Sequence, residues 1–127
     1  MSPRVFLLIF VGGGLGSMLR HAVNQACAAW FGVNFPSGTL AVNVIGSLTM
    51  GLFAGWFAYR GDTQELRLFL TTGILGGFTT FSAFSLDTAL LWERGQHTVA
   101  ALYAGGSVAA GVIGVFAGLA VMRAWLA

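Results

Sequence analysis

The sequence predicts an all-α membrane protein, with a single four-helix transmembrane domain over residues 1–127. Three observations predict it. Of the 127 residues, 57% are hydrophobic and only 8% are charged, whereas a soluble domain carries about 25% charged residues. The apolar residues fall into four stretches, each long enough for the roughly 20 residues that a helix needs to cross the hydrocarbon core. Short polar or glycine-containing connectors separate these stretches.

The four spans are predicted at about residues 5–28, 38–59, 66–92 and 98–125. The N-terminal stretch also has features of a cleavable signal peptide, but Arg20, His21 and Asn24 extend it beyond an apolar leader. We therefore expect a retained first helix. The connector before the second span contains Trp30, Phe31 and Phe35, and such aromatic residues anchor a chain at the membrane–water interface.

The charges are few: six Arg, no Lys, two Asp and two Glu, for a net charge of +2. An even number of spans places both termini on one side of the membrane. That side carries Arg4, Arg60, Arg67 and Arg123, and the other carries Arg94. The arginine bias favours termini inside the cell, but it is small enough that both orientations stay open. The single Cys27 excludes an internal disulfide and a cysteine metal cluster.

The middle of the third span has an unusual composition. Residues 76–85 read Gly-Gly-Phe-Thr-Thr-Phe-Ser-Ala-Phe-Ser. Each glycine weakens a helix by about 1 kcal/mol relative to Ala, and backbone groups freed at membrane depth need protein or a water-filled cavity. Phe78, Phe81 and Phe84 recur every third residue and are expected to share one face. A packing site of small residues is the alternative, but the phenylalanines favour a broken helix that lines a polar path.

Small residues also recur at four-residue spacing in the other spans, where they permit close approach between membrane helices. The second span carries such a row at Thr39, Asn43, Ser47, Gly51 and Gly55, and the fourth at Gly106, Ala110, Gly114 and Gly118. Helix packing is the expected role of the glycines. So many contact faces on a small chain also predict an oligomer.

Polar residues within the spans indicate what kind of ion could pass through the protein. Placing Arg20 in a span costs about 2.5–3.5 kcal/mol, so it is expected to face a wet cavity, to pair with Asp87, or to reach the interface by snorkelling. The Asn43 amide and several hydroxyls can donate hydrogen bonds, and the edge of a Phe ring is electropositive. This lining favours a small anion over a cation. The sequence offers no Ser/His/Asp set and no pair of close carboxylates, so an enzyme is not expected.

Three motifs resemble the CrcB/Fluc family of fluoride channels: Gly12-Gly13…Gly16…Arg20, then Pro36-Ser37-Gly38-Thr39-Leu40…Asn43, then residues 76–85. The resemblance covers all four spans in order. It implies an antiparallel, dual-topology homodimer in the cytoplasmic (inner) membrane, with two pores through which fluoride leaves the cell passively and which confer fluoride resistance. It also implies a central structural Na⁺ shared by both subunits and held by the backbone carbonyls of Gly76 and Thr79.

The resemblance further implies which side chains line the fluoride pore. Phe81, Phe84 and Asn43 match the family's pore residues, and Arg20 matches its vestibule arginine. The other pore residues expected here are Thr39, Thr80, Ser82, Tyr103 and Ser107. The chain departs from the family at three positions: Ala83 replaces a usual Thr, Asp87 replaces a usual Glu, and Gly111 stands where some members carry Ser. These departures affect the expected track of hydroxyls beside the Phe pair.

Two other classes of protein remain as alternatives. A four-helix, dual-topology multidrug exporter requires a protonatable carboxylate in the first span, where this chain has Arg20 and no acid. A membrane scaffold without transport activity accounts for the small-residue rows. It gives no reason, however, for Phe81 and Phe84 to be aromatic.

Overall fold

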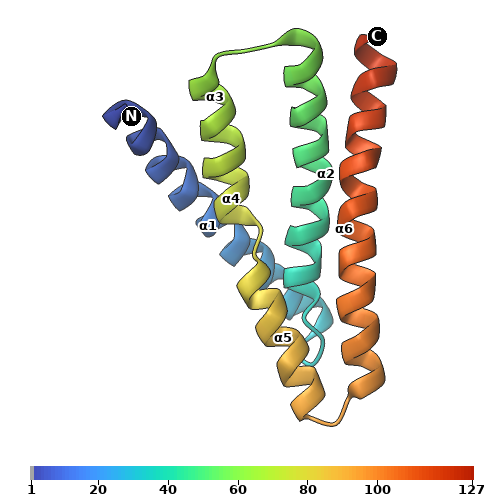
Figure 1. Cartoon of the computed structure of the whole chain (residues 1–127). Helices are drawn as coiled ribbons and strands as arrows, with labels where there is room; N and C mark the ends of the chain where they lie inside the picture. The colour runs from blue at the N-terminus through green and yellow to red at the C-terminus, as the bar shows by residue number, and fades with distance from the viewer. Residues whose placement is uncertain (1) are drawn as a thin grey trace.

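The computed structural model describes residues 2–127. Its four long helical stretches are all long and apolar enough to cross a membrane: α1 (Pro3–Phe31), α2 (Ser37–Arg60), a third stretch over Gln64–Glu93, and α6 (His97–Leu126). Each extends one to three residues beyond its predicted span at either end. Both termini lie at one end of the molecule, and the turn between α5 and α6 lies at the other (Figure 1). The prediction of four transmembrane helices is confirmed.

The third stretch consists of several pieces. It begins with α3 (Gln64–Leu68), continues as the π-helical segment η1 (Phe69–Leu75) and the short α4 (Gly76–Phe78), and resumes as α5 (Phe81–Glu93). Thr79 and Thr80 between α4 and α5 are extended, with φ/ψ of −88°/157° and −150°/119°. The chain changes course at this point (Figure 1). The predicted break is confirmed, and it lies at these two threonines.

Glycines allow α2 and α6 to pack closely, side by side and in the same direction (Figure 1). A Cβ added at Gly118 would lie 2.5 Å from the Leu48 carbonyl oxygen. A Cβ added at Gly51 would lie 3.0 Å from the Cα of Val115. Only a residue without a side chain fits at such distances, so these glycines set the separation of the two helices. Gly106, in contrast, has open space around it.

Helix α1 crosses the third stretch obliquely and packs against η1 and α4 (Figure 1). A Cβ on Gly12 would lie 2.9 Å from the Phe69 carbonyl oxygen, so this crossing also depends on a glycine.

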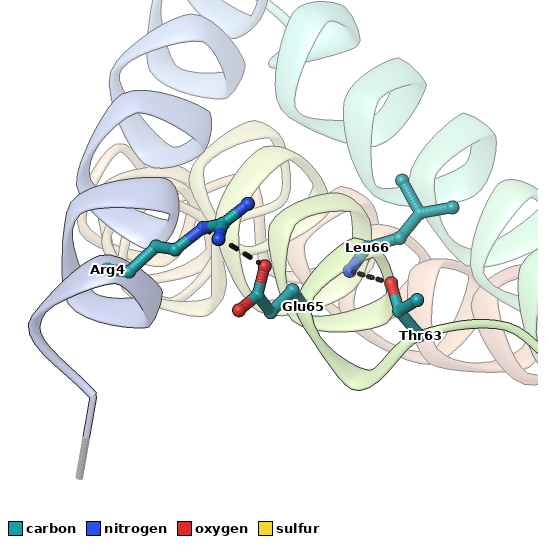
Figure 2. Close-up of polar contacts among 4 residues, drawn as sticks. All are labelled: Arg4, Thr63, Glu65 and Leu66. Atoms are coloured by element: carbon teal, nitrogen blue, oxygen red, sulfur yellow. Dashed lines mark hydrogen bonds and ion pairs between the residues drawn. The ribbon is translucent and has the colours of Figure 1, made fainter.

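Near the termini, Arg4 pairs with Glu65 at 3.3 Å, with both side chains partly exposed (Figure 2). Exposed pairs contribute about 0–1 kcal/mol. Thr63 caps α3 by accepting a hydrogen bond from the Leu66 amide at 3.2 Å.

The α5–α6 end of the molecule contains a small buried core. Leu91, Ala100 and Tyr103 are almost fully buried there, and Leu40 and Phe84 pack against them. The core joins α5 to α6 and to the start of α2. It therefore fixes α5 from its far end, while the break leaves its beginning to be fixed by other contacts.

Candidate functional site

Asn43 of α2 holds the break through its amide group. Its Nδ2 donates to the Thr80 carbonyl oxygen at 3.0 Å, and its Oδ1 accepts from the Thr80 amide at 2.8 Å. These two bonds replace main-chain bonds that a continuous helix would have made. Asn43 therefore anchors the first turn of α5 to α2, from a position 37 residues earlier in the chain.

The threonine hydroxyls at the break bond to nearby backbone. Thr80 Oγ1 accepts from the Ala83 amide at 3.1 Å and so caps the N-terminus of α5. It also lies 3.4 Å from Ser82 Oγ. Thr79 Oγ1 donates to the Leu75 carbonyl oxygen at 2.9 Å. The threonines at the break thus stabilise the interrupted backbone with their own side chains.

The carbonyls of Gly76 and Thr79 lose their usual helical donors at the break. In a continuous helix Gly76 O would accept from the Thr80 amide, which instead donates to Asn43 Oδ1. Thr79 O would accept from the Ala83 amide, which instead donates to Thr80 Oγ1. Within residues 2–127 no cluster of His, Cys, Asp or Glu suits a metal ion. The donors that fit a hard cation here are these backbone oxygens.

A groove of about 330 Å³ lies beside the break, between α2, α5 and α6. Polar side chains and two Phe rings line it from α2, the break and α5, and Ser107, Gly111 and three valines line it from α6. Its lining residues are Asn43, Ser47, Thr79, Thr80, Phe81, Phe84, Ser107, Val108, Gly111, Val112 and Val115. It combines hydrogen-bonding groups and aromatic rings in an otherwise apolar bundle.

The two phenylalanines of the groove lie against each other. The ring centroids of Phe81 and Phe84 are 5.7 Å apart, with the planes at 51°. Phe81 is 78% exposed in the single chain, whereas Phe84 is half-buried. Phe78 is buried at 8% exposure. The expectation that all three share one face is wrong, because the two extended residues reset the helical register between Phe78 and Phe81.

Ser107 of α6 is the polar residue of the groove with the clearest need for a partner. Its hydroxyl oxygen is buried and has no hydrogen-bond partner within residues 2–127. A buried polar group left unsatisfied costs about 1–3 kcal/mol. The groove therefore holds a hydroxyl that a water molecule, an ion or a partner protein could satisfy.

A second hollow, of about 470 Å³, lies toward the α1–α2 connector and contains Asn24, Thr39, Asp87 and Arg94. Asp87 accepts a hydrogen bond from the Tyr103 hydroxyl at 3.3 Å. The ion pair considered between Arg20 and Asp87 is absent from residues 2–127, where the ion pair formed is Arg4–Glu65. The reason is that α1 packs against η1 and α4, whereas the Asp87 side chain meets α6.

The predicted site residues thus divide into groups. Asn43, Thr80, Phe81, Phe84 and Ser107 line one groove. Thr39 lines the second hollow, and Tyr103 is buried between Phe84 and the connector. Ser82 is exposed at the start of α5, and Arg20 is half-buried on α1 outside both hollows. Ser47 also lines the groove and was missed, although its four-residue spacing from Asn43 was a signal.

The fold and the groove define a multi-pass α-helical membrane protein with a polar, aromatic groove at a broken helix. The family model described as "CrcB-like protein, Camphor Resistance (CrcB)" matches residues 7–119, and the chain belongs to this family.

Curated relatives share most of their length with it. A protein of Nitrobacter hamburgensis named "Fluoride-specific ion channel FluC 2" is 63% identical over 93% of this chain and 96% of its own. Proteins named "Fluoride-specific ion channel FluC" from Methylobacterium nodulans and Rhodopseudomonas palustris are 64% and 59% identical, over 92% and 94% of this chain and 94% and 97% of their own. Their names describe ion channels, not enzymes.

Proposed function

We propose that the chain forms a fluoride channel that lets fluoride leave the cell passively across the cytoplasmic membrane and so confers fluoride resistance. One observation carries this proposal. The groove at the break brings the Phe81 and Phe84 rings together with the Asn43 amide and the unpartnered Ser107 hydroxyl. Relatives named as fluoride-specific channels, at 59–64% identity, share this chain's sequence over most of its length.

The lining chemistry suits a small anion that loses part of its hydration shell. Hydroxyl and amide groups donate hydrogen bonds, and the electropositive edges of Phe rings attract negative charge. Phe81 and Phe84 interact with the ion by their edges, and Ser107 donates to it. An inside-negative membrane potential drives the anion outward with about 2.3 kcal/mol per charge per 100 mV. Passive flux needs no nucleotide and no coupling ion.

The channel is an antiparallel, dual-topology homodimer with two pores. Three residues at the break are exposed in the single chain, which supports a second copy there. Phe81 is 78% exposed, and Ser82 and Gly76 are also exposed. A pore that dehydrates its ion needs walls on every side, so a partner has to cover the open side of the groove. The small arginine bias is compatible with insertion in both orientations.

The homodimer carries one structural Na⁺ at its centre. The backbone carbonyls of Gly76 and Thr79 would hold it, because their helical donors are engaged by Asn43 and Thr80. Two antiparallel subunits would supply four such oxygens. When bound, the ion offsets the partial negative charge of these carbonyls. Neutral oxygens suit a monovalent cation better than a divalent one.

The alternatives predict different transport. A proton-coupled exporter of cationic drugs needs a carboxylate in the first span, and α1 carries Arg4 and Arg20 but no acid. A scaffold predicts no flux. The deciding experiment loads liposomes that contain only the purified protein with potassium fluoride or potassium chloride and adds a potassium ionophore. We expect rapid fluoride release and little chloride release. Fluoride release no faster than from protein-free liposomes would contradict the proposal.

A further inference from the structure

Four aromatic rings form a continuous row from the surface of the protein to the groove. The row begins at Phe35 in the α1–α2 connector, passes through Tyr103 of α6 and ends at Phe84 and Phe81 of α5. Successive ring centroids lie 5.6, 5.4 and 5.7 Å apart. These are distances at which aromatic rings interact directly. Phe35 of the connector thus contacts the buried Tyr103 ring, and Tyr103 in turn contacts Phe84, which lines the groove.

Phe35 is held in place by its neighbours in the connector. Its carbonyl oxygen accepts from the Ser37 amide at 2.8 Å. The main-chain carbonyl oxygen of the preceding residue, Asn34, accepts from Arg94 Nη2 at 3.0 Å, which ties the connector to the end of α5. The Phe35 ring meets the Tyr103 ring edge-on, with an interplanar angle of 87°. The Phe35 side chain remains 38% exposed.

Tyr103 transmits this contact to the groove. It is buried, at 4% exposure, and its ring packs against both Phe35 and Phe84. Its hydroxyl donates to Asp87 at 3.3 Å, which fixes one end of the side chain. The ring itself is restrained by its two aromatic neighbours. Removing Phe35 would leave one side of the Tyr103 ring open and give Phe84 more freedom to move.

We propose that Phe35 is a positioning residue for the fluoride path: it fixes the Tyr103 ring and thereby the orientation of Phe84. This inference rests on the proposed function, since it names a residue that tunes the same groove. Phe35 itself does not line the groove at the break. Phe35 raises the fraction of molecules in which the Phe84 ring directs its edge toward the groove.

The test measures fluoride flux from liposomes for Phe35→Leu, which keeps an apolar side chain but removes the ring. One aromatic pair changes an equilibrium by about two- to tenfold, so flux should fall by about two- to tenfold. Phe35→Tyr, which restores a ring, should return flux to the wild-type rate. Phe31→Leu is the matched control, because Phe31 is exposed at the same end and its ring contacts Trp30. It should leave flux unchanged.

A double-mutant cycle separates positioning from a general loss of stability. In a Tyr103→Leu background the row is already interrupted, so adding Phe35→Leu should lower flux no further. Wild-type flux with Phe35→Leu, or equal losses in both backgrounds, would overturn the inference. If Tyr103→Leu does not elute as a folded protein, Phe35→Tyr decides the question. Wild-type flux with Phe35→Tyr would support the inference, and flux as low as that of Phe35→Leu would overturn it. Wild-type flux is measured before that of any variant. Its absence would refute the proposed function rather than this inference.

Discussion

The clamp between Asn43 and Thr80 makes the sharpest prediction about the break. Asn43→Leu keeps a side chain of similar volume but removes both hydrogen bonds to the Thr80 main chain. The Thr80 amide and carbonyl would then lack these partners in a buried position. Each unsatisfied group costs about 1–3 kcal/mol, so the free energy of unfolding should fall by about 2–6 kcal/mol. Asn43→Asp keeps the acceptor but places a carboxylate oxygen against the Thr80 carbonyl oxygen, so it should also lower the free energy of unfolding.

The assay is reversible unfolding in mixed detergent micelles, followed by the fluorescence of the four tryptophans. Thr49→Val is the matched control on α2, because the Thr49 hydroxyl bonds only within its own helix, to the Ile45 carbonyl oxygen. It should change stability by less than about 0.5 kcal/mol. Fluoride flux should also be lost with Asn43→Leu, since the clamp holds Thr80, which caps the start of α5. Stability within about 0.5 kcal/mol of wild type for Asn43→Leu would refute the clamp.

Three further predictions concern packing, topology and the sodium site. Gly118→Ala should lower the free energy of unfolding by about 1–3 kcal/mol through overpacking against Leu48. Gly105→Ala, in open space on the same helix, should not lower it. Equal effects of the two substitutions would contradict the close α2–α6 contact. A tag at the C-terminus should be found on both sides of the membrane in functional protein, and a single location would exclude an antiparallel dimer. Fluoride flux should persist when a sodium gradient is reversed but fall when a large organic cation replaces sodium, and flux that follows the gradient would indicate a coupled transporter.

The sequence was sufficient for the helices and the break. Long apolar stretches separated by short connectors are a direct signal of membrane spans. Two glycines and a run of hydroxyl residues in mid-span indicated that the third helix is interrupted. Both signals are local in the chain, and local composition decides whether a helix can continue. The position of the break at Thr79 and Thr80, and the π-helical turn before it, depend on contacts that composition does not contain.

The arrangement of the site was less predictable, because it depends on pairs far apart in the chain. The Asn43–Thr80 clamp joins residues 37 positions apart. The Tyr103–Asp87 bond depends on how α5 and α6 are rotated against each other. A continuous helix would have aligned Phe78 with Phe81, and the extended threonines separate them. Ser47 was recognised in the polar row of the second span but not as part of the groove, since its neighbours come from α6.

The most direct test of the central claim asks whether the groove at the break is the fluoride path. Fluoride flux is measured in liposomes for Phe81→Ile and for Phe116→Ile, an exposed phenylalanine of α6 outside the groove. Loss of the Phe81 ring should lower flux at least about tenfold, which corresponds to about 1.4 kcal/mol, while Phe116→Ile should conduct like wild type. A folded Phe81→Ile protein with unchanged flux would show that the ion does not pass along this groove.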